Sequence, residues 1–405
     1  MGSFMPSTYQ LARVMPEAAA RDDFLPFHVP AIGDEEIAAV VDVLKSGWLT
    51  TGSKVKEFEQ EFCRFVGARH GVAVNSATAA LHLALAAIGI KEGDEVIVPT
   101  MTFAATAEVV LYLKAKPVLV DCSGDTLNID PAAIERAITP RTKAIIPVHF
   151  AGEPCDSEAI LSLARAHGLK VIEDAAHALP ARDHSQMIGS IGDITCFSFY
   201  ATKTITTGEG GMATTNNPEW ADRMRMLSLH GINHDAWNRY SSEGSWYYEV
   251  THVGYKYNLT DIAASLGIEQ LKKCYRFADA RRRVADAYTA AFTDVAEIRT
   301  PFSDPDKEHA WHLYVIQLEL ERLTINRSEF IELLRKNKIG SSVHFIPLHF
   351  HPYYRQTFGY QPADFPNAAD AYQRIVSLPI YPDMTVTDVE DVIGAVRSIV
   401  DGYRR

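Results

Sequence analysis

The sequence has no long block of basic residues, and its formal net charge is −12 over 405 residues. A nucleic-acid-binding surface needs Lys and Arg side chains gathered against successive phosphates, so we expect no nucleic-acid partner. No apolar run approaches the roughly 18 residues of a membrane-spanning helix, so we expect no membrane segment. The first residues also lack the charged and apolar regions of a secretory signal.

Cysteine is scarce, and its five positions form no C-x-x-C pair. Scattered thiols in odd number build neither a disulfide framework nor a cysteine-based zinc site. They predict reduced, mostly buried side chains in a cytoplasmic protein. The five residues are Cys63, Cys122, Cys155, Cys196 and Cys274.

Two nucleotide-binding signatures are also missing. In the P-loop pattern the lysine follows the glycines, whereas Lys203 precedes the glycine cluster at 208–211. No G-x-G-x-x-G follows a predicted strand, which argues against a nicotinamide-binding Rossmann site.

Short apolar runs alternate with helix-like stretches between residues 71 and 215. This alternation predicts βαβ units and a mainly parallel sheet that is buried on both faces. We therefore expect an α/β fold with a large domain over residues 1–260. The predicted strands are 71–74, 95–98, 117–120, 144–148, 170–173, 194–199 and 212–215.

Residues 261–405 predict a smaller α+β domain. One long helical stretch covers 260–292, and 312–320 alternates like a strand with one face exposed to solvent. We expect a further strand near 341–345. Other helices are expected at 34–46, 327–337 and 387–401.

The segment Asn75-Ser76-Ala77-Thr78 places small polar residues between a predicted strand and a helix. A helix N-terminus presents free N–H groups and the positive end of the helix dipole, which suits a phosphate group. An ordinary N-cap would use the same types of residue, and this alternative stays open.

Asp174 follows the apolar run at 171–172, at the edge of a parallel sheet where ligands bind. A carboxylate in this place is able to keep a heterocyclic cofactor nitrogen protonated. An aspartate that only caps a loop accounts for the pattern equally well.

Lys203 lies between the apolar run at 197–199 and the glycines at 208–211. Such a lysine is commonly a surface residue with an exposed ammonium group. A nucleophilic amine must instead be desolvated or crowded by positive charge, so that it loses its proton. The glycines nearby allow the backbone to approach a ligand closely.

Five short motifs then occur together in one order along the chain. They are Ser-Ala-Thr-Ala at 76–79, Pro-Thr-Met-Thr-Phe at 99–103, Glu-Asp-Ala-Ala-His at 173–177, Ser-Phe-Tyr-Ala-Thr-Lys at 198–203 and Thr-Gly-Glu-Gly-Gly at 207–211. In this combination the chain resembles the DegT/StrS family of nucleotide-sugar aminotransferases, which are pyridoxal-phosphate (PLP) enzymes of fold type I. The resemblance extends from 47–52 to 377–379, nearly the whole chain.

The resemblance implies a role for each matching residue. Lys203 would form the Schiff base with PLP and move protons, and Asp174 would pair with the pyridinium nitrogen. Phe103 would lie against the ring, although without the resemblance a core aromatic at a helix start is the favoured account. The other implied cofactor contacts are Ala77, Thr78, His177, Ser198 and, reaching the neighbouring subunit of a homodimer, Asn258.

The same resemblance implies the substrates. The family transfers an amino group from glutamate, which leaves as 2-oxoglutarate, to a nucleotide-linked keto-sugar. Residues 230–261 resemble the enzymes that make UDP-4-amino-4-deoxy-L-arabinose, which favours amination at C4 of a 4-keto-6-deoxy or 4-keto-pentose sugar over C3. Departures at 152–156 and 344–354 leave the nucleotide and the sugar open. The candidate substrate contacts are Thr51, Arg239, Lys256 and His344; Arg239 and Lys256 fit solvated surface charges equally well.

Three other functions occur on this fold. A PLP-dependent sugar dehydratase would have histidine in place of Lys203 or additional cluster-binding cysteines. A regulatory protein without activity would have lost Lys203 or Asp174. A cyclitol aminotransferase uses the same residues and stays open. We expect no metal, because His344, His349 and His351 have no carboxylate or cysteine at a recognised spacing.

Overall fold

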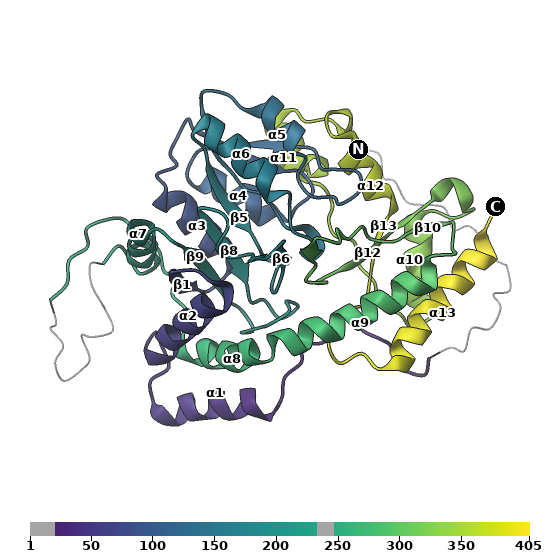
Figure 1. Ribbon diagram of the computed structural model, residues 1–405, viewed down its shortest axis with the longest axis horizontal. Helices are drawn as coiled ribbons and strands as arrows, with labels where there is room; N and C mark the ends of the chain where they lie inside the picture. Colours follow the sequence, from purple (N-terminus) through teal and green to yellow (C-terminus); the bar gives the residue numbers. More distant parts are fainter. Residues whose placement is uncertain (1–20, 233–246) are drawn as a thin grey trace, which may run out of the picture.

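The largest sheet has seven strands in the order β1-β9-β8-β5-β4-β2-β3, in a computed structural model that describes residues 21–232 and 247–405 (Figure 1). Neighbouring strands are parallel except that β9 runs antiparallel to both β1 and β8. The predicted α/β fold with a mainly parallel sheet is confirmed. The strands are β1 (His70–Val74), β2 (Glu95–Pro99), β3 (Lys116–Val120), β4 (Thr142–Ile145), β5 (Lys170–Asp174), β8 (Ile194–Ser198) and β9 (Gly211–Thr215).

Helices cover both faces of this sheet, which explains why its strands are apolar throughout. Val96 and Val98 of β2 pack into the core formed with α3 (Ala77–Ala87) and α4 (Ala104–Tyr112). Ile97, between them, points to the opposite face and packs with residues of α5 and α6. Successive residues of a strand face opposite sides, so continuous apolar runs are expected here. The remaining helices around the sheet are α1 (Asp34–Ser46), α2 (Ser53–Val66), α5 (Pro131–Ala137), α6 (Ser157–His167) and α7 (Pro218–Ser228).

The predicted helix over 260–292 is two helices in the structure, α8 (Asp261–Lys272) and α9 (Cys274–Phe292). They separate at Lys273, whose ammonium group pairs with two glutamates of α1 at 2.9 and 2.6 Å. α8 packs against α1 and α2, whereas α9 extends away to a second hydrophobic core (Figure 1). Cys274 and Phe277 at the start of α9 still pack with α8, whereas the later residues of α9 belong to the second core. The domain division at residue 260 stays a prediction.

The second core surrounds a three-stranded antiparallel sheet in the order β10-β12-β13. All five residues of β12 are buried because β12 is the central strand, so the predicted solvent-exposed face is wrong. The predicted strand at 341–345 is also wrong: Ser342 makes only an isolated bridge to Ser377. The elements here are β10 (Ile298–Arg299), β12 (Tyr314–Leu318), α10 (Arg327–Lys336), β13 (Ile375–Leu378) and α13 (Val386–Tyr403). Two further helices, α11 (Pro352–Phe358) and α12 (Pro366–Arg374), pack their buried residues into the core of the large sheet.

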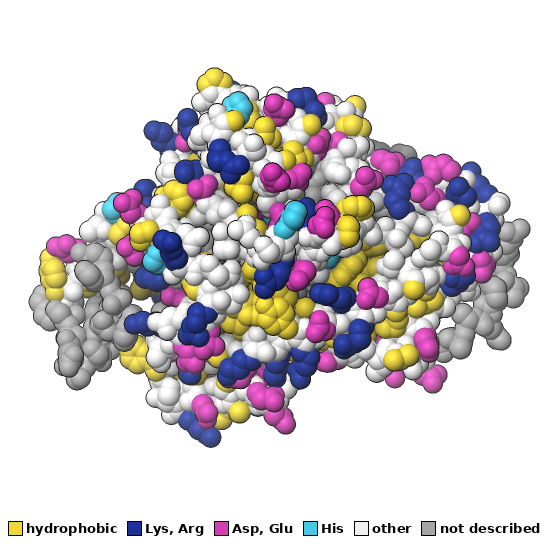
Figure 2. Space-filling view, in the orientation of Figure 1, with side chains coloured by type: hydrophobic (Ala, Val, Ile, Leu, Met, Phe, Trp, Pro, Cys, Tyr) yellow, Lys and Arg dark blue, Asp and Glu magenta, His cyan; other side chains and the backbone are white. Residues whose placement is uncertain are grey.

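A third, small sheet joins β11 (Lys307–Glu308) to β6 (Arg182–Asp183) and β7 (Gln186–Met187). All five cysteines are buried and free. Within residues 21–232 and 247–405, no helix is both long enough and apolar enough to cross a bilayer. On the face seen in Figure 2, acidic and basic side chains are interspersed rather than gathered by sign.

Candidate active site

A cavity of about 470 Å³ opens at the carboxyl edge of the large sheet, where parallel strands β5 and β8 end. It brings together most of the residues that the sequence suggested, although they come from widely separated segments. The predicted residues that line it are Ala77, Thr78, Phe103, Asp174, His177, Ser198, Lys203 and His344.

Lys203 lies in the turn after β8, where its backbone N–H donates to the Tyr200 carbonyl at 2.9 Å. The side chain is partly buried and lines the cavity. Burial lowers the pKa of Lys203 to about 8; Asp174 opposes this shift and Arg281 adds to it. A surface lysine with an exposed ammonium group is therefore the wrong description of Lys203. Its amine is unusually ready to lose a proton.

Asp174 ends β5 and is buried. Its Oδ2 accepts a hydrogen bond of 2.9 Å from the Thr106 hydroxyl, and its Oδ1 accepts one of 3.1 Å from the Ala176 N–H. Burial raises the pKa of Asp174, while these two bonds and the charge of Lys203 act in the opposite direction. The hydrogen bond from the Ala176 N–H is the kind that an aspartate makes when it caps a loop. The carboxylate also faces the cavity, so it is available to a ligand.

The N-terminus of α3 forms another part of the wall. Ser76 is the N-cap and accepts a hydrogen bond from the Ala79 N–H at 3.1 Å. Ala77 and Thr78 follow in the first turn, whose N–H groups have no acceptor inside a helix. A Cβ atom on Gly211 would lie 2.5 Å from the Ser76 carbonyl group and 2.7 Å from the Ala77 nitrogen. Gly211 is therefore required for β9 to approach this helix start.

Phe103 is the N-cap residue of α4, and 64% of its surface is exposed. A core aromatic is therefore the wrong description, because the ring lies in the cavity wall rather than in a hydrophobic core. His177, by contrast, is buried and stacks on Phe345 with ring centroids 5.7 Å apart. The exposed phenyl ring of Phe103 in the cavity wall is a suitable surface for a flat ligand ring.

Sequence reasoning missed two further histidines in the wall, His28 and His312. The His312 ring lies 4.3 Å from the His177 ring. Burial lowers the pKa of His28 to about 3 and that of His312 well below its usual value. These imidazoles are therefore neutral near pH 7, as is His344, whose pKa burial lowers to about 4. No sequence motif marked His28 or His312, because only tertiary packing brings them to Lys203.

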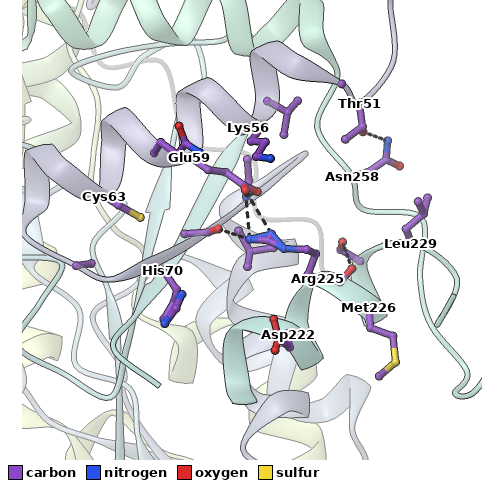
Figure 3. Close-up of a pocket in the computed structure, with 18 of the residues that line it drawn as sticks. Thr51, Lys56, Glu59, Cys63, His70, Asp222, Arg225, Met226, Leu229 and Asn258 are labelled. Carbon is purple, nitrogen blue, oxygen red and sulfur yellow. Dashed lines mark hydrogen bonds and ion pairs between the residues drawn. The ribbon is translucent and has the colours of Figure 1, made fainter. Parts of the chain in front are cut away.

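The remaining predicted residues do not line this cavity. Thr51 and Asn258 line a second cavity of about 870 Å³, and Nδ2 of Asn258 donates a hydrogen bond of 2.7 Å to the Thr51 hydroxyl (Figure 3). Lys256 lies beside the same segment, where its carbonyl accepts a weak hydrogen bond of 3.4 Å from the Asn75 amide. Arg239 lies outside the described residues.

This second cavity, the Asn258 groove, lies between α2, the start of β1 and α7 (Figure 3). Arg225 of α7 crosses it and contacts Glu59 of α2 at 3.2 Å and the Gly71 carbonyl at 2.9 Å. Asn258 does not cap α8: Thr260 does so through its bond from the Ala263 N–H. The Asn258 side chain instead bonds to Thr51 and lines the groove.

No group of three or more His, Cys, Asp or Glu side chains in the described part of the chain is arranged to hold a metal ion. His349 is fully buried, and its Nδ1 lies 2.8 Å from the Thr100 hydroxyl. His344 lines the cavity, whereas neither His349 nor His351 does so.

The cavity of Lys203 fits PLP. The amine of Lys203 suits the aldehyde, and the buried carboxylate of Asp174 suits the ring nitrogen. The start of α3, which Gly211 keeps open, suits the phosphate group. Phe103 and His177 offer surfaces for the ring faces. The residues present therefore offer partners for the aldehyde, the ring nitrogen and the phosphate group of PLP.

Comparison with known proteins agrees with this geometry. The model of the DegT/DnrJ/EryC1/StrS aminotransferase family matches residues 30–397. The chain is 55% identical over 383 residues to the spore coat polysaccharide biosynthesis protein SpsC of Bacillus subtilis, covering 94% of this chain and 98% of that one.

Solved structures give the same result. A proposed sugar aminotransferase of Streptococcus pneumoniae in its PLP form superposes with a TM-score of 0.87 at 35% identity, covering 93% of this chain and 99% of that one. PseC of Helicobacter pylori, an aminotransferase involved in the biosynthesis of pseudoaminic acid, has a TM-score of 0.87 at 30% identity, covering 94% and 100%. The chain belongs to the DegT/DnrJ/EryC1/StrS aminotransferase family, and it is a PLP-dependent sugar aminotransferase of fold type I.

Proposed function

We propose that the enzyme transfers the amino group of glutamate to C4 of a nucleotide-linked 4-keto-sugar, and that Lys203 moves the proton in both halves of the reaction. The observation that carries this proposal is the position of the Lys203 amine, with its lowered pKa, in one cavity with Asp174 and the start of α3. The name of SpsC, a spore coat polysaccharide biosynthesis protein, favours a role in the synthesis of surface glycans.

Each residue has a distinct task. PLP, when bound, supplies an electron sink that stabilises negative charge at the reacting carbon. Lys203 removes the proton from the donor carbon and later delivers a proton to the sugar carbon, a contribution of roughly 10²–10⁴-fold for a positioned acid–base group. Asp174 holds a negative charge at the ring nitrogen. Ala77, Thr78 and Ser198 hold the phosphate group.

The wall of the cavity suits a hydroxylated substrate. His28, His312 and His344 are neutral and can exchange hydrogen bonds with hydroxyl groups. Among the described residues of the wall, Lys203 is the one Lys or Arg. The diphosphate of a nucleotide sugar and the carboxylates of glutamate need cations, so further positive groups must come from outside this wall.

A second copy of the chain is the proposed source of those groups, in a homodimer whose active sites are shared. Asn258 and Thr51 lie in the Asn258 groove rather than in the cavity of their own Lys203, and Lys256 lies beside them. We propose that Asn258 binds the cofactor phosphate of the partner, and that Thr51, Lys256 and Arg239 contact the substrate there. His344 contacts the substrate from its own subunit. With five buried free thiols, we propose the cytoplasm as the location.

The substrate is tested by supplying the PLP-loaded protein with glutamate and a panel of acceptors. The panel contains nucleotide-linked 4-keto-sugars, nucleotide-linked 3-keto-sugars and an unphosphorylated keto-cyclitol, and mass spectrometry detects the amine. We expect turnover of a 4-keto-sugar and formation of 2-oxoglutarate. Turnover confined to a 3-keto-sugar would overturn the position of amination, and turnover confined to the cyclitol would overturn the substrate class.

A further inference from the structure

The guanidinium group of Arg281 is fully buried, although no carboxylate of the described residues pairs with it. Its Nη1 donates to three backbone carbonyls, those of Trp311, His312 and Ile380, at 3.4, 3.1 and 2.8 Å. Its Nε and Nη2 atoms are buried without a hydrogen-bond partner. A buried charge is normally paired with an opposite charge, because the interior solvates it poorly. Arg281 is therefore a buried cation without a counter-charge among the described residues.

Arg281 lies on α9, directly behind the wall of the active-site cavity. Two of its three acceptors, the carbonyls of His312 and Ile380, belong to residues that line the cavity together with Lys203. The hydrogen bonds therefore tie two separate segments of the wall to one cation. The field of that cation acts across the wall, because it lowers the pKa of His28 and His312 in addition to the larger effect of burial.

Among the described residues of the cavity wall, no side chain other than Lys203 itself carries a positive charge near pH 7. The imidazoles of His28, His177, His312 and His344 face the cavity and are neutral near pH 7, since burial lowers the pKa of each.

Two acids face the same space. Asp174 is buried and attracts the protonated amine of Lys203, and it is the group that favours the ammonium form. Glu209 is exposed at the cavity rim, where water screens its charge. Asp174 raises the pKa of Lys203 and burial lowers it, and a fixed cation nearby lowers it further.

We propose that Arg281 is a positioning residue whose unpaired positive charge favours the free amine of Lys203 and whose hydrogen bonds fix the wall opposite it. A like charge in a poorly polarisable interior disfavours a second proton on the amine. A carboxylate beside Arg281 would cancel this effect, and none of the described residues supplies one. The inference rests on the proposed role of Lys203 as the amine that reacts with PLP.

The test compares Arg281→Gln with Arg281→Met in the full chain. Both substitutions remove the charge, but glutamine keeps N–H groups for the carbonyls whereas methionine does not. Acetylation of Lys203 in the protein without cofactor is followed by peptide mass spectrometry over a pH series, with Lys256 of the same sample as the internal reference. The rate of PLP capture is read by visible absorbance, and circular dichroism checks that each variant is folded.

We expect the acetylation midpoint of the wild type near pH 8, where the Lys203 pKa lies. Arg281→Gln should move it upward, so that the free amine and the rate of PLP capture near pH 7 both fall by a factor of a few. Arg281→Met should move the midpoint in the same direction. A wild-type midpoint in either folded variant would overturn the inference.

If Arg281→Gln does not fold, Arg281→Met decides, because an apolar side chain replaces the unpaired buried charge without leaving a buried polar group. A wild-type midpoint in folded Arg281→Met would overturn the inference. These readouts are independent of the sugar. Failure of the acceptor panel would overturn the proposed substrate and leave the Lys203 midpoints unaffected. A failed shift would overturn the role of Arg281 and leave the transferase reaction unaffected.

Discussion

The hydroxyl of Thr106 donates a hydrogen bond of 2.9 Å to Oδ2 of Asp174, and both side chains are buried. The Thr106 oxygen lies 2.7 Å from the Thr102 hydroxyl, so a short chain of hydroxyls ends on the carboxylate. This bond opposes the effect of burial, which raises the pKa of Asp174. Thr106 thereby helps to keep the carboxylate ionised for a cationic ring nitrogen.

Replacing Thr106 by valine should weaken cofactor binding. The valine keeps the shape but removes a bond to a charged group, worth about 2 kcal/mol, or roughly 30-fold in the Kd for PLP. Titration of the protein with PLP, followed by visible absorbance, measures the change. Thr106→Ser keeps the hydroxyl and is the control. Equal PLP affinity in the valine and serine variants would show that the hydrogen bond has no such role.

Gly211→Ala should displace the start of α3. Its Cβ would lie 2.5 Å from backbone atoms of Ser76, which cannot move without shifting the helix N-terminus. We expect a loss of about 1–3 kcal/mol in the free energy of unfolding and weaker binding of PLP. Gly394→Ala, in α13 with nothing within 4 Å of its Cβ, is the matched control and should be neutral or stabilising. Unchanged PLP affinity in Gly211→Ala would contradict the placement of the phosphate group.

Lys203→Met should stabilise the protein without cofactor. The folded pKa is lowered to about 8 from an ordinary 10.5, so between these values the unfolded chain holds a proton that the folded chain has lost. Stability therefore rises with pH through this window, and the full penalty is present below pH 8. Removing the amine should raise the free energy of unfolding at pH 7 by up to about 3 kcal/mol.

Thermal unfolding over a pH series measures this effect. The gain in Lys203→Met should shrink as the pH rises from about 8 to 10.5 and then disappear. Lys91→Met, at an exposed lysine, is the control and should show no such trend. A Lys203→Met protein that is less stable than the wild type at pH 7 would refute the account of a desolvated amine.

Asp261→Ala should loosen the segment that carries Thr51. The buried carboxylate accepts hydrogen bonds from the backbone N–H groups of Gly52, Lys54 and Val55, at 2.8, 3.2 and 3.0 Å. Losing all three should lower the free energy of unfolding, measured in urea, by about 3 kcal/mol. Asp261→Asn keeps one acceptor oxygen and should lower it less. Equal stability of Asp261→Ala and the wild type would show that Asp261 does not hold the segment that carries Thr51.

Two inactive variants should restore activity when they are mixed, if the active sites are shared. Lys203→Ala lacks the amine, and Asn258→Asp would place a carboxylate against the partner's cofactor phosphate. Random exchange between the two dimers gives hybrids with one intact site, so roughly a quarter of the wild-type activity should return. No recovery after subunit exchange, verified by native mass spectrometry, would contradict a site shared between subunits.

The large sheet was predictable because its signal is local. Each of its strands is a short apolar run, and β5 and β8 place Asp174 and Ser198 at the sheet edge where ligands bind. The sequence motifs also identified Lys203 and the start of α3, since each follows such a run within a few residues.

The errors arise where long-range packing decides the outcome. β12 is central in its sheet, so Gln317 is buried although its polarity suggested an exposed face. The break between α8 and α9 lies at Lys273, whose ion pairs are with α1, more than two hundred residues earlier in the chain. His28 and His312 reach the cavity from segments without any motif, and the buried charge of Arg281 is invisible in a helix rich in arginine.

The most direct test of the central claim identifies the lysine that bonds to PLP. The PLP-loaded protein is reduced with sodium borohydride, which fixes the cofactor to the lysine that holds it, and is then digested for peptide mass spectrometry. We predict that the PLP mass lies on the peptide containing Lys203, and that Lys203→Ala carries none. PLP fixed to a different lysine, or to none while the protein remains active, would contradict the account.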